Sequence, residues 1–328
     1  MVEMVEASAP GKVILFGEHF VVKGTRSLAS AISLRVSVAV RRLQEGPLRV
    51  YSDRAGVHGD TVDLETLATS NATLKPLAAL IRYLRDEYDI KPLPATVNVK
   101  SSIPIGAGLG SSAAFAAAFA LAYARLAGVR LELDDIWKAS FESEKVAHGR
   151  PSGIDNTLAV YGGSILYRPG FRGFRLDIGL PEGYQIVIAN TGVPRSTRDV
   201  VRSVLDRAER TWEASKYVYE AADKIVGLAL DALRKGDVEL LADLMELNQG
   251  LLYGMGASSI HIERLLYAAR SAGALAAKLT GAGRGGCVIV LAREPDVGRI
   301  VSVLRGEGAT EVFPVSLGSP GVRLEREE

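Results

Sequence analysis

The chain has 328 residues, of which 48% are hydrophobic and 23% charged, and its formal net charge at pH 7 is +1. That length suits two domains with a large core, and the near-zero charge argues against a protein that binds nucleic acid or a membrane surface. The single cysteine excludes an intrachain disulfide and fits a reducing, cytoplasmic location. The first residues lack the basic and long apolar regions of a secretory signal.

The first half of the chain is predicted to be rich in strands. Runs of β-branched or alternating residues, broken by glycine, proline and charged clusters, indicate strands at 4–10, 12–17, 34–42, 48–52 and 96–102. Apolar residues spaced at i, i+3, i+4 and i+7 predict a helix over 73–88. Two more helices are predicted over 111–127, which is rich in alanine, and over 134–147, with Asp134 as the N-cap.

The second half begins with strands and is then mostly helical. Strands are predicted at 163–168, 173–178 and 184–191, and amphipathic patterns predict helices over 197–234, 237–252, 258–272 and 295–306. A strand pair broken by glycines is expected in 277–292, and a final strand near 310–315. A run of glycine and proline around 169–183 divides the chain into domains 1–180 and 181–328, and the order of elements predicts an α+β architecture.

The segment GAGLGSSAA (106–114) lies between a predicted strand and a predicted helix. A glycine-rich turn that enters a helix leaves several backbone N–H groups free, which is typical of a phosphate site. In isolation, a tight loop without a ligand is an equal alternative. The spacing excludes a P-loop and a dinucleotide-binding turn, because the glycines read G-x-G-x-G and no acidic residue closes a second strand about twenty residues later.

Lys12 follows Pro10 and Gly11 and opens an apolar strand, where a lysine gains little from packing. It is either a cation directed at a phosphate or a substrate hydroxyl, or a lysine that protects the edge of a sheet from aggregation. The acid–imidazole pair Glu18 and His19 follows a few residues later.

Two carboxylates in the middle of the chain are candidates for different chemical roles. Trp137, Phe141 and Glu144 are spaced at i, i+4 and i+7, so the apolar face of this helix ends in a carboxylate. A buried carboxylate must be paired, hydrogen-bonded or bound to a metal; a solvated last helical turn is the alternative. Eleven residues later, the Pro/Gly loop 148–155 ends at Asp155. One carboxylate could hold a metal and the other could accept a proton.

A third glycine-rich segment, KLTGAGRGGC (278–287), runs into an apolar strand. Its glycines allow close backbone approach to a ligand or a neighbouring strand, although glycine hairpins are common. Cys287 is interpreted as a core strand residue, and no role is assigned to His58 or His148.

Three motifs in this order resemble the GHMP kinases, the family named for galactokinase, homoserine, mevalonate and phosphomevalonate kinases. They are SAPGKVILFGEHFVVKG (8–24), PIGAGLGSSAA (104–114) and KLTGAGRGGCVIV (278–290). Within the family, the branch that phosphorylates mevalonate is similar at ESEKVAHGRPSGIDN (142–156), NTGVPRSTRDVV (190–201) and LNQGLL (247–252). Galactokinases carry an aspartate–tyrosine pair where Phe20 and Val21 follow His19 here.

The resemblance implies a two-domain α+β fold, with an N-terminal domain like ribosomal protein S5 and a ferredoxin-like C-terminal domain. It implies ATP-dependent transfer of a phosphoryl group to the 5-hydroxyl of mevalonate with Mg²⁺, which yields 5-phosphomevalonate and ADP for isoprenoid biosynthesis. Another GHMP small-molecule kinase, such as one acting on phosphomevalonate, is the nearest alternative, and a non-catalytic ligand sensor on the same fold is a second. A homodimer is a family expectation.

The resemblance also implies roles for individual residues. The ATP phosphates would be held by Gly106, Ala107, Gly108, Leu109, Gly110, Ser111 and Ser112, with Ser101 near the nucleotide. Ser112 and Glu144 would hold Mg²⁺. Asp155 would be the base, with Lys12 beside it. The acceptor would be contacted by Glu18, His19 and Thr197. The third motif usually has glycine where this chain has Arg284, which could reach phosphate, substrate or solvent.

Overall fold

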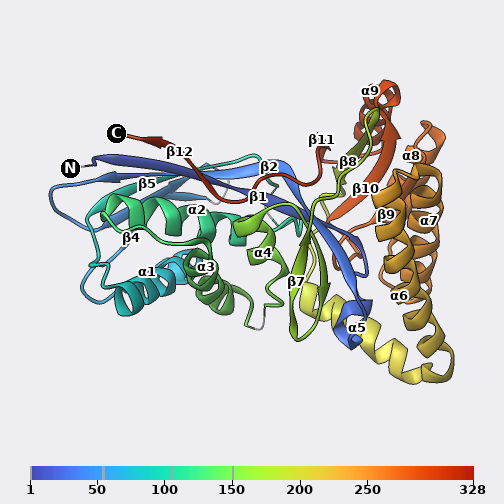
Figure 1. The fold of residues 1–328 in the computed structure, drawn as a ribbon, viewed down its shortest axis with the longest axis horizontal. Helices are drawn as coiled ribbons and strands as arrows, with labels where there is room; N and C mark the ends of the chain where they lie inside the picture. Colours follow the sequence, from blue (N-terminus) through green and yellow to red (C-terminus); the bar gives the residue numbers. More distant parts are fainter. Residues whose placement is uncertain (1, 54–55, 105, 150) are drawn as a thin grey trace.

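The computed structural model describes residues 2–53, 56–104, 106–149 and 151–328. Within these residues the chain forms two β-sheets, each packed against its own group of helices, as Figure 1 shows. The mixed α+β fold predicted from the sequence is therefore confirmed.

The larger sheet has its main strands in the order β12-β1-β2-β5-β3-β4, and β6 and β7 extend it from β2. The strands are β1 (Met4–Phe16), β2 (Ser27–Arg42), β3 (Leu48–Ser52), β4 (Val57–Val62), β5 (Ala95–Ser101), β6 (Ser164–Arg168), β7 (Phe171–Leu176) and β12 (Arg323–Glu327). The predicted strands 4–10 and 12–17 form one strand, β1, whose register against β2 shifts between Pro10 and Lys12. This bulge lies directly before Lys12, the cation that the sequence singles out as a candidate site residue.

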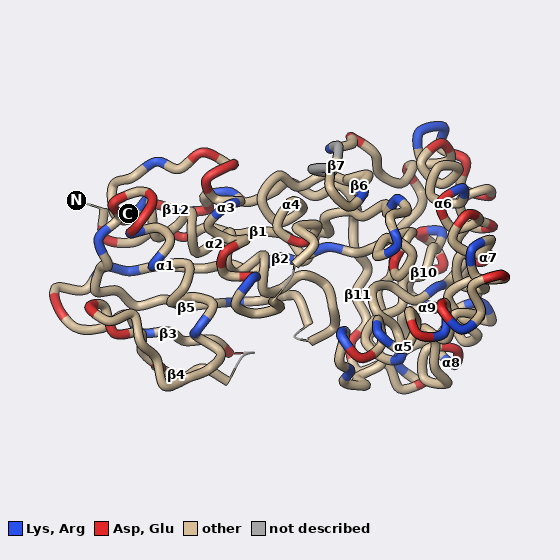
Figure 2. The backbone as a smooth tube through the Cα atoms, turned by 90° about the horizontal axis from the view of Figure 1, so that it is seen from below, with Lys and Arg blue, Asp and Glu red and all other residues tan. Residues whose placement is uncertain are grey.

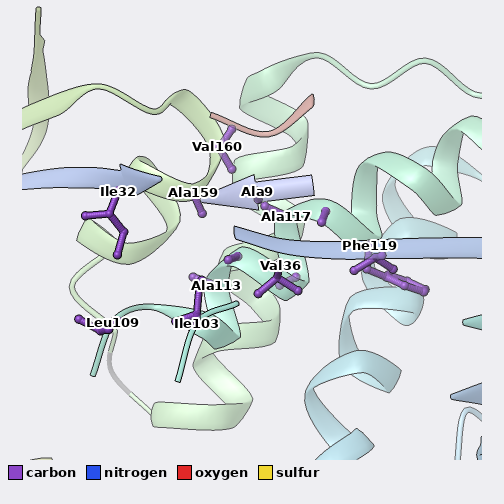
Figure 3. Close-up of a cluster of buried hydrophobic side chains, with 14 of the residues drawn as sticks. Ala9, Ile32, Val36, Ile103, Leu109, Ala113, Ala117, Phe119, Ala159 and Val160 are labelled. Carbon is purple, nitrogen blue, oxygen red and sulfur yellow. The ribbon is translucent and has the colours of Figure 1, made fainter. Parts of the chain in front are cut away.

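Four helices pack against one side of this sheet: α1 (Lys75–Tyr88), α2 (Ser111–Leu126), α3 (Leu133–His148) and α4 (Ile154–Tyr161). Helix α2 is central because its alanines let it lie close to β1 and β2. Ala113 and Ala117 join Ala9 and Val36 in the main hydrophobic cluster, shown in Figure 3. The alanine-rich run is thus a buried helix, as predicted.

The predicted N-cap of α3 is wrong by two positions. The cap is Glu132, whose carboxylate accepts from the backbone of Asp135, while the Asp135 carboxylate accepts from Glu132 N at 3.2 Å. This reciprocal arrangement satisfies two backbone donors at once. Asp134 instead accepts a hydrogen bond from the Tyr161 hydroxyl of α4.

The smaller sheet has the antiparallel order β11-β8-β10-β9. Its strands are β8 (Tyr184–Asn190), β9 (Ala276–Leu279), β10 (Cys287–Arg293) and β11 (Glu311–Val315), and its helices are α5 (Thr197–Arg210), α6 (Trp212–Lys235), α7 (Val238–Gly254), α8 (Ile260–Ser271) and α9 (Val297–Gly306). The single helix predicted over 197–234 is wrong: it is divided at Thr211, which has a non-helical backbone and donates its hydroxyl to Arg207 O at 2.9 Å.

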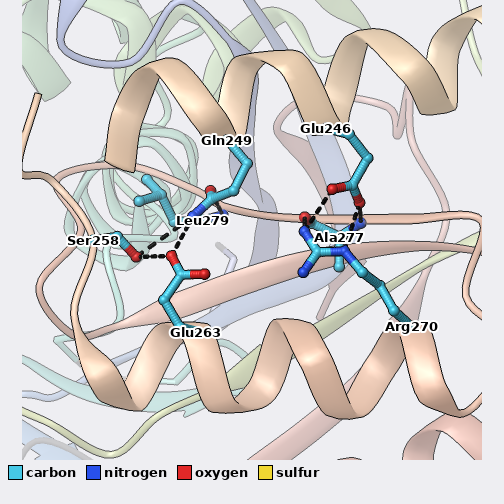
Figure 4. A network of polar contacts seen from close by, with 7 residues as sticks. All are labelled: Glu246, Gln249, Ser258, Glu263, Arg270, Ala277 and Leu279. Atoms are coloured by element: carbon cyan, nitrogen blue, oxygen red, sulfur yellow. Dashed lines mark hydrogen bonds and ion pairs between the residues drawn. The ribbon is translucent and has the colours of Figure 1, made fainter. Parts of the chain in front are cut away.

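Strand β9 is attached to the helices by two polar clusters that Figure 4 shows. Glu246 of α7 and Arg270 of α8 form an ion pair at 2.6 Å, and both bond the backbone of Ala277. Gln249 accepts from Leu279 N at 2.9 Å and donates to Glu263 at 2.9 Å. These contacts fix the strand that leads into the third glycine-rich segment.

The last strand, β12, returns to the first sheet and pairs antiparallel with β1. Arg35 holds the segment before β12, because its guanidinium donates to Pro320 O at 2.7 Å and to Gly321 O at 2.8 Å. The division of the chain into 1–180 and 181–328 stays a prediction. Charges of both signs interleave along α6 to α9, as Figure 2 shows. Among the described helices, none is both long and apolar enough to cross a membrane.

Candidate active site

In the glycine-rich loop, glycines with a left-handed backbone alternate with apolar residues whose side chains are buried. Gly106, Gly108 and Gly110 have φ values of 71°, 81° and 76°, in the left-handed region that favours glycine. The residues between them, Ala107 and Leu109, are buried in the main core. The loop is therefore anchored by two apolar side chains and ends at Gly110, the N-cap of α2. Such a turn before a helix N-terminus suits an anion.

Lys12 lies directly under this loop and is paired with Asp155. Its backbone N–H donates to Leu109 O at 2.9 Å, and its Nζ lies 3.1 Å from Asp155 Oδ1. The lysine is buried, whereas the carboxylate remains 33% exposed. A Cβ added at Gly110 would lie 3.0 Å from Lys12 Cγ and 3.6 Å from Asp155 Oδ2, so the pair adjoins the loop. At Lys12 the strand pairs with β2 on one side, and on the other its N–H is taken by Leu109 O of the loop. Because the side chain is also buried, the alternative of an exposed lysine that protects a sheet edge is excluded.

Glu144 is buried near the C-terminal end of α3, which excludes the solvated-turn alternative. The Ser112 hydroxyl, in the first turn of α2, donates to its carboxylate. Burial raises the pKa of Glu144, and the nearby charge of Asp155 acts in the same direction, against the opposing effects of Ser112 and Lys12. His148 Nε2 lies 3.6 Å from Glu144 Oε2, a contact that their i, i+4 spacing could have indicated.

Ser112 and Glu144 together fit a magnesium site in which the protein supplies some of the ligands and nucleotide phosphates supply others. Mg²⁺ typically takes one or two protein oxygens and completes its shell with water and substrate phosphates. Among the described residues, no cluster of three or more His, Cys, Asp and Glu side chains could hold a metal by itself. A buried carboxylate with a raised pKa would be stabilised in its charged form by a divalent cation at this position.

The two residues after Gly17 are deeply buried and bonded to the second half of the chain. Glu18 pairs with Lys278 of β9, both side chains being fully buried, and it accepts from Asn248 Nδ2 at 3.1 Å. His19 donates from Nε2 to Ala282 O at 2.7 Å, which leaves Nδ1 as a buried acceptor without a partner among the described atoms. Burial lowers the pKa of His19, so the ring is neutral at pH 7.

Arg195 is a half-buried cation in the segment that leads into α5, and the sequence pattern assigns it no role. Its Nη2 donates to Ala107 O at 3.4 Å, while Nε and Nη1 are buried and lack partners among the described atoms. A Cβ at Gly286 would overlap the guanidinium, and one at Gly108 would lie 2.7 Å from Nη2. Arg195 therefore fills the space between the first and third glycine-rich segments. Burial lowers its pKa, and an anion placed beside it would be strongly stabilised.

The remaining candidates lie at the margins of this arrangement. The Ser101 hydroxyl donates to Ile103 O at 3.0 Å and accepts from Ile103 N at 3.1 Å, so it shapes the turn before the loop. Thr197 is exposed at the first position of α5, after the Ser196 N-cap. Among the hydrogen bonds and ion pairs of the described residues, none joins these two to Lys12, Glu144 or Asp155.

Cys287 is a core residue of β10, as predicted. Burial raises the pKa of its thiol to about 12, which excludes a role as a thiolate nucleophile at neutral pH.

The comparisons with known proteins agree with this geometry. Residues 75–163 match the GHMP kinases N terminal domain, residues 229–310 match the GHMP kinases C terminal domain, and residues 3–42 match the galactokinase galactose-binding signature. The mevalonate kinase of Aeropyrum pernix is 45% identical over 97% of this chain and 98% of the relative.

Two solved structures are also similar over nearly the whole chain. The Methanococcus jannaschii mevalonate kinase is 26% identical with a TM-score of 0.84, covering 97% of this chain and 99% of that one. The L. major mevalonate kinase in complex with R-mevalonate is 29% identical with a TM-score of 0.83, covering 96% of both. The chain belongs to the GHMP kinase family, which confirms the resemblance carried by its three motifs.

Proposed function

We propose that this chain is an ATP-dependent kinase that phosphorylates the 5-hydroxyl of mevalonate, producing 5-phosphomevalonate and ADP. The observation that carries the proposal is the Lys12–Asp155 pair, 3.1 Å apart and directly beside the glycine-rich loop at the N-terminus of α2. A carboxylate and a cation beside an anion site suit phosphoryl transfer to an alcohol. The relative in Aeropyrum pernix is named mevalonate kinase and covers almost the same length.

The proposed mechanism uses positioning and charge stabilisation. Backbone N–H groups at the start of α2 hold the ATP phosphates. Asp155 accepts the proton of the acceptor hydroxyl, whose oxygen attacks the γ-phosphorus while the bond to the β–γ bridging oxygen breaks and ADP leaves. Lys12 stabilises the negative charge that develops on the reacting oxygens. Ser112 and Glu144 would hold Mg²⁺, which when bound would neutralise charge on the phosphate oxygens.

Two unpartnered groups support a negatively charged acceptor that also carries a hydroxyl. Arg195 is half-buried, but its Nε and Nη1 are buried atoms without partners among the described atoms. His19 Nδ1 is a buried acceptor that likewise lacks a partner among these atoms. Mevalonate supplies a carboxylate for the first and a hydroxyl for the second, whereas galactose has no charge to offer Arg195. We propose these two residues as contacts of the acceptor, with Thr197 beside them. Glu18 acts through its buried contacts, which hold the loop that carries His19.

An acceptor panel tests the proposed function. Purified protein with ATP and Mg²⁺ is assayed for ADP release with mevalonate, phosphomevalonate, galactose and homoserine. We expect kcat/KM for mevalonate to exceed that for galactose by at least ~100-fold, because galactose leaves the charged Arg195 without a partner. Mevalonate should also be preferred over phosphomevalonate, which has no free 5-hydroxyl, and over homoserine, which carries an ammonium group beside its carboxylate. Preference for galactose, whose binding signature matches residues 3–42, would contradict the proposal. ATP binding without turnover on any acceptor would instead favour the sensor alternative. The homodimer and the cytoplasmic location stay predictions.

Glu144→Gln is expected to raise the Mg²⁺ concentration needed for half-maximal activity by about 10-fold while the fold is kept. The other proposed ligands, Ser112 and the nucleotide phosphates, remain, but one negative charge at the metal is lost. A magnesium titration of the mevalonate-dependent rate measures this. Glu142→Gln is the matched control, since Glu142 pairs with Lys145 on the surface of the same helix. A titration unchanged from wild type would argue against Glu144 as a metal ligand.

A further inference from the structure

Arg284 interrupts the third glycine-rich segment and has an unusual backbone for its residue type. Its φ is 55°, in the left-handed region, and its neighbours Gly283 and Gly285 also have positive φ. Its backbone N–H donates to Ala257 O at 2.7 Å, which fixes the turn. A residue with a Cβ is disfavoured in this conformation, so the side chain must make compensating contacts.

The side chain of Arg284 contacts protein groups in two other elements. Nε donates to Gly256 O at 2.9 Å, just beyond the C-terminal end of α7, and Nη2 donates to Ser203 Oγ at 2.8 Å on α5. This settles the question that the sequence left open, since the guanidinium is engaged by the protein itself. Arg207, one turn after Ser203, donates to Gly254 O at 3.1 Å, so two arginines attach one face of α5 to the end of α7.

Helix α5 continues directly from the segment that carries Arg195, the half-buried cation of the site. Arg195 precedes the first residue of α5, Thr197, by two positions, and its guanidinium packs against Gly286, two positions after Arg284. The third glycine-rich segment therefore contacts the 195–203 segment at both ends, through Gly286 at Arg195 and through Arg284 at Ser203. Fixing Ser203 limits how far Arg195 can move from the glycine loop.

We propose that Arg284 is a positioning residue that sets the affinity for the acceptor by holding α5, and with it Arg195 and Thr197, against the third glycine-rich segment. The part of this inference that concerns acceptor affinity rests on the proposed function, whereas the part that concerns the position of α5 does not. Arg284 touches neither Lys12 nor Asp155, so its effect falls on acceptor binding and leaves the transfer step intact. Its guanidinium fork is essential, because one planar group must donate in two directions at once.

Arg284→Gly separates this role from a merely structural one. Glycine accepts φ of 55° without strain, and that gain offsets much of the loss of two hydrogen bonds, so we expect the melting temperature to change by less than about 3 °C. KM for mevalonate is expected to rise by about 10-fold with kcat within about twofold of wild type. Ser203→Ala removes one end of the same bridge and should raise KM about threefold, with little further rise in the double variant.

Two further variants test what part of the side chain acts. Arg284→Lys keeps the positive charge near His19 but lacks the fork, and it is expected to share the raised KM; a wild-type KM in this variant would overturn the proposal in favour of a simple charge effect. Arg202→Ala is the matched control, since Arg202 is an exposed arginine on the same helix. Its KM and kcat should both equal those of wild type.

A second readout does not depend on the substrate. Hydrogen–deuterium exchange of the free protein should show faster exchange over 195–203 in Arg284→Gly and Ser203→Ala than in wild type or Arg202→Ala. Unchanged exchange over this segment would overturn the proposal, as would equal losses in kcat and melting temperature without a change in KM. If wild type phosphorylates none of the acceptors, the proposed function fails while the exchange experiment still decides whether Arg284 holds α5.

Discussion

Asp155→Asn is expected to lower kcat for mevalonate phosphorylation by at least ~100-fold, within the usual range for removing a general base. The amide has nearly the shape of the carboxylate and can still contact Lys12, which lies 3.1 Å away, but it cannot accept the proton of the acceptor hydroxyl. The replacement removes the charge partner of the buried Lys12, but the amide oxygen can still accept from the ammonium, and the site of Asp155 at the start of α4 is one-third exposed, so the fold should be kept. Steady-state ADP release, with melting temperature as the check on folding, measures the effect.

The control for this variant is Asp231→Asn on α6. Asp231 is exposed and lies 3.9 Å from Arg234, so it forms only a weak surface pair, and the variant should keep wild-type kcat. A loss of less than threefold in Asp155→Asn would remove Asp155 from the role of base. A large rise in KM for mevalonate with kcat preserved would instead make Asp155 a binding residue.

The parts of this site that follow from local sequence could be predicted. The spacing of Trp137, Phe141 and Glu144 depends only on the helical period, and the structure buries Glu144 as that period requires. The glycine-rich loop could also be predicted, because alternating glycines before a helix permit the left-handed backbone that such a turn requires. The assignment of Lys12 and Asp155 as partners came from the family resemblance, since nothing local relates residues so far apart along the chain.

What could not be predicted depends on tertiary contacts. Two atoms of the Arg195 guanidinium are buried because Gly108 and Gly286, from two separate glycine-rich segments, lie against it, and no pattern near Arg195 in the sequence indicates that. The pairing of β12 with β1 joins the two ends of the chain. The division between α5 and α6 depends on a single threonine hydroxyl that competes with the backbone, and the hydrophobic periodicity runs through it unchanged.

Lys278→Met is expected to destabilise the protein by about 3–5 kcal/mol, the range found when one partner of a buried ion pair is removed. Lys278 and Glu18 are both fully buried, and the ammonium also donates to Leu279 O at 2.7 Å. Burial lowers the pKa of Lys278 and the charge of Glu18 opposes that effect, so each charge depends on the other for its stability. Methionine keeps the volume of the side chain, and the loss therefore reports on the charge left alone on Glu18.

Chemical denaturation at pH 7 measures this prediction, with two further variants that separate charge from packing. Arg270→Met breaks the partly exposed ion pair between Arg270 and Glu246, which bonds the backbone of Ala277, the neighbour of Lys278 in β9 (Figure 4). This variant is expected to cost only about 1 kcal/mol. Glu18→Gln combined with Lys278→Met removes both buried charges and should recover at least half of the loss, since an uncompensated charge no longer remains. If the double variant were as unstable as Lys278→Met alone, the loss would come from packing around β9, and the ion pair would not be what joins the Glu18–His19 loop to the second sheet.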